Sequence, residues 1–485
     1  RLGGPAAMPL RALLAPLVGA AALPRYHELF FEQRFDHFDA GSGRRWSHRY
    51  LLNNESWDGR GALGGCRGPI LLYAGNEGDI EFFWRSNGWM VEELAPRFGA
   101  LLLFPEQRFY GKSQPAGPRP LASEMRVLST AQVLEDYVAL LAEVRAATPG
   151  AAGCPAVAFG GSYGATLAAL LRARHPEAVA GAYAASSEIG FYDLERWAAH
   201  GLDGLAWEDT AAATWSGAGP SCFEAIRNLS GAIASQDPRG GGWEERFHVC
   251  DIEAMGSPRS DFFAYAVEGL AQADYPSARG ALPANPVRHF CAEFVEAARA
   301  GSTEAMLDAA AAFTDAALGG SAAHCVTRNL GGPSNTPGDG PGDSAWGYQS
   351  CTETLHAFSA RRIRRYDFDL PTSAALCDQV WNGTARPNMT ALAGGFALAD
   401  GSAGVRNLIW TQGTLDPWGA WFVGRVRAPA PGSGVHHFVM RGAAHHLDLA
   451  GPSAADPADV VAARRAAAGI IEGWLQGAAP GMLVV

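Results

Sequence analysis

One serine in this chain stands where a nucleophile would be activated. Residues 156–169 begin with an apolar run, continue through Gly-Gly-Ser-Tyr-Gly at 160–164, and end in small residues with helical character. This pattern predicts a strand, a sharp turn with Ser162 at its tip, and a helix. The first amides of that helix would point toward the serine and favour negative charge there. The arrangement suits a serine whose attack on a carbonyl carbon creates an oxyanion.

Two later residues could complete the chemistry of Ser162. Asp416 and His445 each come after a predicted apolar strand, and the chain order Ser, Asp, His is that of an α/β-hydrolase. A G-x-S-x-G match alone is weak in a chain with 59 glycines, because a plain strand–turn–helix connection gives the same pattern. The three residues together favour the hydrolase interpretation.

The elements that would position these residues alternate along the chain. Helical spacing over 130–147 lies between predicted strands, and a closing helix is expected at 457–476. Such alternation predicts a mostly parallel sheet of the α/β class. The expected strands are 45–54, 69–74, 100–104, 155–160, 178–186, 405–410 and 435–440.

The middle of the chain interrupts this alternation. Helical patterns occur there, for example over 261–273 and 291–317, and a Gly-, Pro- and Ser-rich loop is expected at 318–345. We predict an α/β-hydrolase fold with a large helical, disulfide-containing cap inserted before the acid strand, where it can act as a lid. The expected parts are an N-terminal extension and signal peptide (1–22), a first hydrolase part (25–187), a helical cap (188–400) and a second hydrolase part (401–480).

The composition excludes several kinds of partner. The 485 residues are 48% hydrophobic and 18% charged, which is typical of a large globular protein. A net charge of −11 argues against nucleic acid or an anionic membrane as the main partner. His446 and Asp448 beside His445 could suggest a metal site, but neighbouring histidines point in different directions and no i, i+4 ligand pair accompanies them. We therefore predict no metal and no cofactor, and leave the oligomeric state open, with a homodimer as one option.

Three features favour the secretory pathway. Residues 8–22 combine a basic residue, a short apolar run and an Ala-Ala-Ala end, as signal peptides do, although an ordinary apolar helix would look similar. The chain holds eight cysteines and no C-x-x-C zinc pattern, so disulfides are expected. N-glycosylation sequons begin at Asn54, Asn228, Asn382 and Asn388.

The predicted sheet itself suggests one disulfide. Cys66 and Cys154 each precede a predicted strand by a similar distance. If those strands are the third and fifth of such a sheet, they are neighbours, and the two cysteines start side by side. We therefore predict a Cys66–Cys154 bond, which requires their Cα atoms to lie within about 7 Å.

Further segments across nearly the whole mature chain resemble the lysosomal prolyl exopeptidases. This family includes dipeptidyl peptidase II, lysosomal Pro-Xaa carboxypeptidase and thymus-specific serine protease. The Leu-Pro-Ala-Asn-Pro sequence at 282–286 is closer to dipeptidyl peptidase II than to the carboxypeptidase. The other similar segments are 31–38, 73–79, 106–113, 160–164, 273–276, 348–353, 415–418 and 444–449.

The resemblance implies a role for each candidate residue. Ser162 would be the nucleophile, Asp416 the acid and His445 the base of a serine peptidase that cleaves after proline or alanine. Trp418 would line a compact pocket for proline, although a core tryptophan is the alternative. Proline has a fixed φ and no amide hydrogen, so it needs such a pocket. The implied cap disulfides are Cys222–Cys291, Cys250–Cys325 and Cys351–Cys377.

The chain also departs from the family pattern. Ala165 replaces a glycine, Gln107 a histidine and Ala450 an arginine. None of these changes removes a triad residue. The changes at 107 and 450 leave the pH optimum open, because an arginine at 450 could tune the neighbouring histidine.

The loop that follows the strand at 69–74 should contribute to the chemistry. The Tyr163 amide and a group around Asn76 would bind the oxyanion, and each such donor contributes roughly 3 kcal/mol to the transition state. Glu77 could pair with the free ammonium group of a substrate, as release of an N-terminal dipeptide requires. A structural hydrogen bond is the alternative role for this carboxylate.

The residues and the resemblance are compatible with more than one function. Release of N-terminal Xaa-Pro dipeptides is favoured, and removal of a C-terminal residue after proline is the alternative, with peptides carrying a penultimate proline as the expected substrates. A secreted esterase or lipase is disfavoured because the Gly-Asn-Glu-Gly loop places an acid at the catalytic mouth. A non-catalytic binding protein is disfavoured by the intact triad. Lysosome, vacuole and secretion all fit the predicted signal peptide.

Overall fold

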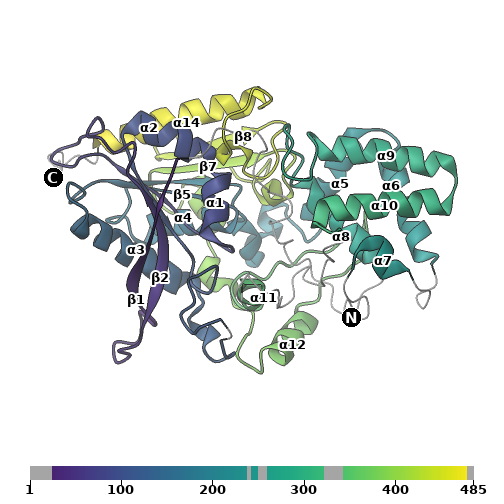
Figure 1. Cartoon of the computed structure of the whole chain (residues 1–485), viewed down its shortest axis with the longest axis horizontal. Coiled ribbons are helices and arrows are strands. Elements are labelled where there is room, and N and C mark those ends of the chain that lie inside the picture. The colour runs from purple at the N-terminus through teal and green to yellow at the C-terminus, as the bar shows by residue number, and fades with distance from the viewer. Residues whose placement is uncertain (1–23, 119, 237–241, 250–258, 322–341, 478–485) are drawn as a thin grey trace.

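The computed structural model describes residues 24–118, 120–236, 242–249, 259–321 and 342–477. Its centre is an eight-stranded sheet with the order β1-β2-β4-β3-β5-β6-β7-β8 (Figure 1). The β1–β2 and β2–β4 pairs are antiparallel, and the other neighbouring pairs are parallel. The strands are β1 (His27–Arg34), β2 (Arg45–Asn53), β3 (Ile70–Tyr73), β4 (Leu101–Pro105), β5 (Ala156–Gly161), β6 (Gly181–Ala185), β7 (Leu408–Gly413) and β8 (Val435–Met440).

The parallel strands are apolar because both faces of the sheet are covered. Side chains such as Leu71 and Val157 belong to one apolar layer, with α1 (Ile80–Ser86), α2 (Ala95–Phe98) and most of α14 (Ala458–Gly477). Their neighbours Leu72 and Ala158 belong to the other layer, with α3 (Thr130–Ala147) and α4 (Tyr163–Arg174). The strand order and the two helical layers define the α/β-hydrolase fold.

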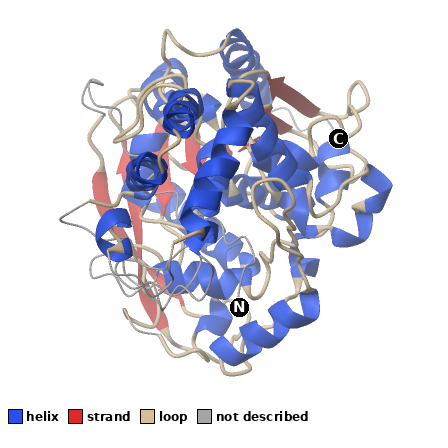
Figure 2. Cartoon of the chain, turned by 90° about the vertical axis from the view of Figure 1, so that its right-hand side faces the viewer, coloured by secondary structure: helices blue, strands red, loops and turns tan. Residues whose placement is uncertain are grey.

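The described chain between β6 and β7, hereafter the insertion, is built from helices. Several of them pack together beside the sheet, and they stand in front of the strands when the molecule is turned by 90° (Figures 1 and 2). The helices are α5 (Ala206–Ala218), α6 (Cys222–Ala234), α7 (Trp243–Phe247), α8 (Arg259–Ala271), α9 (Pro286–Ala300), α10 (Thr303–Leu318), α11 (Gly342–Ser350), α12 (Leu370–Val380) and α13 (Gly395–Asp400).

Two sequence predictions for the insertion need correction. The helical pattern over 291–317 is divided between α9 and α10, because Gly301 adopts a left-handed φ of 69° and the Ser302 side chain caps the next helix. The loop expected at 318–345 overlaps α11, which begins at Gly342. Residues 322–341 of that loop lie outside the described residues.

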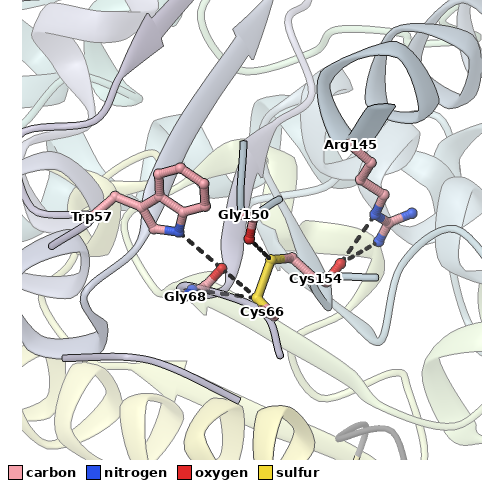
Figure 3. The surroundings of a disulfide bond; sticks show 6 residues. All are labelled: Trp57, Cys66, Gly68, Arg145, Gly150 and Cys154. Atoms are coloured by element: carbon pink, nitrogen blue, oxygen red, sulfur yellow. Dashed lines mark hydrogen bonds between the residues drawn. A yellow bond between two sulfur atoms is a disulfide. The ribbon is translucent and has the colours of Figure 1, made fainter. Parts of the chain in front are cut away.

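The predicted Cys66–Cys154 disulfide is present, with Cα atoms 5.0 Å apart. The two cysteines precede β3 and β5, which are hydrogen-bonded neighbours. Trp57 Nε1 donates to the Gly68 carbonyl at 3.0 Å, and the Arg145 guanidinium donates to the Cys154 carbonyl (Figure 3). The disulfide therefore lies in a hydrogen-bonded setting at the start of two central strands.

The insertion holds further disulfides. Cys222 pairs with Cys291, and Cys351 pairs with Cys377, with Cα separations of 5.2 and 5.4 Å. The pairing expected for Cys250 and Cys325 lies outside the described residues.

The N-terminal edge of the sheet contains a strand that the sequence pattern did not reveal. β1 pairs along its whole length with β2, and most of its side chains are exposed or only partly buried. An edge strand of this kind lacks the apolar run that marks the central strands. The signal peptide expected within residues 1–22 lies outside the described residues.

Surface features bear on the predicted secretory route. The four sequon asparagines, Asn54, Asn228, Asn382 and Asn388, are all exposed, as glycosylation requires, and the modification itself stays a prediction. Within the described ranges, no helix is both long and apolar enough to cross a membrane.

Candidate active site

The residues singled out from the sequence gather at one edge of the sheet. Asn76 comes after β3, Ser162 after β5, Asp416 after β7 and His445 after β8. These strands are parallel, so their C-terminal ends meet at the edge where α/β sheets bind ligands. Residues more than 350 positions apart in the chain are thereby brought to one place.

Ser162 occupies a strained turn between β5 and α4. Its φ of 59° and ψ of −129° are uncommon for a residue with a side chain, and such conformations cluster at functional sites. The Ser162 N–H donates to the Ala185 carbonyl of β6 at 3.0 Å, which fixes the turn. A Cβ atom on Gly160 would lie 2.0 Å from the Gly164 carbonyl oxygen, so the turn requires glycine at 160. This is the geometry of a nucleophile elbow.

Asp416 and His445 form a buried pair. His445 Nδ1 lies 2.9 Å from Asp416 Oδ2, and both side chains are at most 1% exposed. The other carboxylate oxygen, Oδ1, accepts the Trp418 backbone N–H at 3.1 Å. His445 Nε2 is buried and has no hydrogen-bond partner in the described ranges. The pair can therefore accept a proton at Nε2 while Asp416 orients and stabilises the imidazole ring.

The histidine loop abuts the serine turn. A Cβ atom on Gly161 would lie 3.1 Å from the His446 ring, so the residue after His445 packs directly on the residue before Ser162. The described chain shows no hydrogen bond between Ser162 and His445 themselves. Catalytic contacts of this kind often tighten only when a substrate binds.

The loop after β3 packs against the start of α4. A Cβ atom on Gly164 would lie 2.9 Å from Asn76 Oδ1, so this loop and the helix N-terminus are in close contact. Asn76 Oδ1 accepts the Tyr73 hydroxyl at 3.0 Å, and its Nδ2 donates to Glu77 at 2.8 Å. Asn76 Nδ2 has a second N–H, so an oxyanion contact from this loop would come from that N–H or from a backbone amide.

Comparison with known proteins places this geometry in a family. A family model described as "Serine carboxypeptidase S28" matches residues 33–467. The chain belongs to this serine peptidase family. The expected membership of the prolyl exopeptidases is confirmed, since the mouse (Mus musculus) "Lysosomal Pro-X carboxypeptidase" is 30% identical over 481 residues, covering 94% of this chain and 91% of that protein.

Other relatives of this S28 peptidase have different names. The human (Homo sapiens) "Thymus-specific serine protease" is 27% identical over 482 residues, covering 94% of this chain and 88% of that protein. Among solved structures, a proline iminopeptidase of Mycobacterium smegmatis covers 94% of this chain and 100% of its own, with 12% identity and a TM-score of 0.37.

Glu77 adds an ionisable group to the site of this S28 peptidase. Burial raises the pKa of its carboxyl group to about 7, and the negative charge of Glu188 acts in the same direction. The hydrogen bond from Asn76 and the proximity of His445 lower the pKa, but by less. The Glu77 carboxyl group thus interacts electrostatically with both His445 and a second acid, Glu188.

That second acid belongs to a buried cluster that sequence reasoning missed. The Tyr192 hydroxyl donates to Glu188 Oε1, and His356 Nε2 lies 3.2 Å from Glu188 Oε2 and 3.1 Å from the Tyr192 oxygen. All three residues are less than 5% exposed. Glu188 could have been noticed, because it is the first charged residue after a predicted strand, at the edge of the sheet where Ser162 also lies. His356 carries no comparable signal in the sequence.

Trp418 connects the acid loop to the insertion. It is 3% exposed, and its indole Nε1 donates to Gln272 Oε1 at 2.7 Å. The His356 ring packs edge-on against it with centroids 5.0 Å apart, and the ring of Phe358 lies 5.8 Å away. The predicted pocket residue therefore sits in an aromatic cluster that also holds the Glu188–His356 pair.

The side chains of the residues directly after His445 are directed into the protein interior. Asp448 accepts hydrogen bonds from the Tyr183 hydroxyl and from Thr411 Oγ1, so it points into the sheet. Burial holds the pKa of His446 well below its usual value, with the charges of His445 and Arg279 acting the same way. In the described part of the chain, no group of three or more metal-ligating side chains could hold an ion.

Proposed function

We propose that this S28 peptidase is an exopeptidase that cleaves after proline or alanine and releases N-terminal Xaa-Pro dipeptides. The observation that carries this proposal is the buried Asp416–His445 hydrogen bond at the sheet edge where Ser162 occupies its strained turn. The name Pro-X carboxypeptidase of the relatives supports the preference for proline.

The proposed reaction follows from the roles of three side chains. Ser162 Oγ forms a bond to the carbonyl carbon of the substrate while His445 Nε2 takes its proton. The carbonyl oxygen gains the negative charge, which the Tyr163 amide and the loop at Asn76 would bind. The C–N bond then breaks and His445 gives its proton to the leaving amine. Water, deprotonated by His445, releases the acyl group from Ser162 and restores the serine.

Two acids favour the amino-terminal direction of attack. Glu77 and Glu188 interact electrostatically, and a cationic ammonium group would complement the negative charge that Glu77 carries above neutral pH. The alternative, removal of a C-terminal residue after proline, is favoured by the names of the relatives. That activity would need a group that binds the substrate's carboxylate, either a cation or a protonated carboxyl group.

The proposed cellular route is the secretory pathway, ending in the lysosome, in the vacuole or outside the cell. The exposed sequons and the disulfides support it, as does the word lysosomal in the relatives' names. Peptide substrates are the proposed partners.

One experiment tests the activity and its direction. A free-amine Xaa-Pro chromogenic amide and an amino-blocked Pro-Phe peptide are compared between about pH 4 and 8, with Ser162→Ala as the control. Cleavage of the amide alone is expected. Cleavage of the blocked peptide alone would establish the carboxypeptidase, and hydrolysis by the Ser162→Ala variant would remove the nucleophile assignment.

A further inference from the structure

The backbone of His445 is held by the insertion. Its N–H donates to the Gln272 carbonyl oxygen at 2.9 Å, and its carbonyl accepts the Tyr275 hydroxyl at 3.0 Å. Both partners lie just after α8, far from β8 in the sequence. We propose that Gln272 and Tyr275 are positioning residues for His445, so that the base is correctly placed only while the insertion is docked. This inference rests on the proposed role of His445 as the base.

The hydrolase part holds the backbone on both sides of His445, and the Ala443 carbonyl oxygen accepts the Leu415 N–H at 3.0 Å. The His446 N–H donates to Ser186 Oγ at 2.7 Å, at the end of β6. From α14, the Arg464 guanidinium donates to the carbonyls of Leu447, Asp448 and Ala450. Both backbone polar groups of His445 itself bond to the insertion. A shift of the insertion would therefore act first on the base.

The insertion also makes contacts that lead to Asp416. Gln272 Oε1 accepts the Trp418 indole N–H at 2.7 Å, and the Trp418 backbone N–H donates to Asp416 at 3.1 Å. Thr214 Oγ1 of α5 lies 3.3 Å from the Leu415 carbonyl oxygen. Both members of the Asp–His pair are thus tied to the insertion, the histidine directly and the aspartate through Trp418.

Tyr275 is itself firmly held. It is 2% exposed, and the Arg279 guanidinium carbon lies 3.7 Å above the centre of its ring. Its carbonyl accepts the Asn285 N–H at 2.7 Å, at the start of α9. Burial raises the pKa of the Tyr275 hydroxyl, so the group stays protonated and remains a hydrogen-bond donor at working pH. A rigid donor of this kind can fix the carbonyl it binds.

Tyr275→Phe tests the inference by removing only the hydroxyl. Small displacements of catalytic groups can cost up to roughly a hundredfold in rate, so we expect kcat to fall roughly tenfold or more while KM changes less than about twofold. The rate at which a fluorophosphonate probe labels Ser162 should fall in parallel, because it reports the same activation. Tyr348→Phe is the matched control, since its hydroxyl bonds the Thr384 carbonyl at 3.2 Å elsewhere in the insertion.

Two further variants keep the test decisive if Tyr275→Phe folds poorly. Gln272→Ala retains the main-chain carbonyl that binds His445 but loses the contact that leads through Trp418 to Asp416, so kcat should fall, by less than in Tyr275→Phe. Arg279→Met removes the cation above the Tyr275 ring and keeps the hydroxyl, so a smaller loss of kcat is expected. Wild-type kcat in folded Tyr275→Phe, or an equal loss in Tyr348→Phe, would overturn the inference.

Failure of the proposed function would look different. A wild-type protein that cleaves neither prolyl substrate, but whose Ser162 still reacts with the probe, leaves the positioning inference testable through the labelling rate. A wild-type Ser162 that does not react at all would remove the proposed function and the inference together.

Discussion

Glu77 has a raised pKa, and this gives its proposed role as the partner of the substrate's ammonium group a characteristic pH dependence. Its carboxyl group has a pKa of about 7, because of burial and then the charge of Glu188. The group is therefore neutral in acid and negative above neutrality. An α-ammonium group, with an ordinary pKa of about 7.7–8.0, carries its charge up to that range. In the free enzyme and the free substrate, both groups are mostly charged between about pH 7 and 8.

Glu77→Gln should remove the pH range in which residue 77 and the substrate's ammonium group carry opposite charges. At about pH 7.5 we expect KM for free-amine Xaa-Pro substrates to rise roughly tenfold, because a hydrogen bond to a charged group is lost. The rise of kcat/KM from acid toward neutral pH should flatten in the variant. Steady-state kinetics across pH measures both, with the wild type as the comparison. An unchanged KM for free-amine substrates would remove the ammonium role.

The raised pKa of Glu77 should make the free energy of unfolding fall as pH rises. The unfolded chain releases the Glu77 proton near its ordinary pKa of about 4.3, whereas the folded protein holds it to about 7. Ionisation therefore costs stability as pH rises through this range. Glu77→Gln should lose less stability than the wild type between pH 5 and about 8, which thermal melts at the two pH values would show.

The interaction free energy between Glu188 and His356 can be measured separately. Replacing His356 with leucine leaves a buried carboxylate with Tyr192 as its remaining contact in this cluster, which is costly. Glu188→Gln should recover part of that loss. Urea unfolding of both single variants and the double variant should give a coupling of roughly 0.5–3 kcal/mol. Additive losses would mean that the two side chains are merely neighbours.

At the scale of elements, the disulfides tie together strands and helices that are distant in sequence. The Cys66–Cys154 bond closes 88 residues and joins the starts of β3 and β5, whereas Cys351–Cys377 closes 26. Chain-entropy reasoning gives the longer loop roughly 4–5 kcal/mol and the shorter roughly 3–4 kcal/mol. Replacing both cysteines of a pair by serine should lower the free energy of unfolding in that order. Denaturant titration of the two double variants checks it, and a reversed order would contradict the loop-length argument.

The same elements show what a sequence can and cannot reveal. The central strands are buried on both faces, so they appear as apolar runs, and the serine turn is a local pattern of glycines. Strand adjacency then predicted Cys66–Cys154. β1 was not predicted from the sequence because it is an edge strand with mixed polar and apolar side chains. The break between α9 and α10 was not predicted because the apolar pattern continues across Gly301.

Contacts between distant parts of the whole molecule lie beyond such reasoning. Glu188 and His356 are 168 positions apart, and Tyr275 and His445 are 170 apart. Neither pair leaves a periodic or local pattern, because only the packing of the insertion on the sheet brings the partners together. The meeting of Ser162, Asp416 and His445 was predictable because each follows a strand at the same edge. Residues of the insertion, such as Tyr275, hydrogen-bond to this site, and no comparable strand-end rule predicts which side chains of the insertion reach it.

The packing of the whole molecule predicts that the sheet and the insertion unfold together. One continuous apolar cluster includes Leu72 of β3, Leu140 of α3, Trp215 of α5 and Phe294 of α9. Exposing either part would open this shared core, so the two should not melt independently. Calorimetry should show one transition, with activity lost at the midpoint at which helical circular dichroism is lost. Two transitions, with activity disappearing in the first while most helix persists, would show that the insertion undocks as a separate unit.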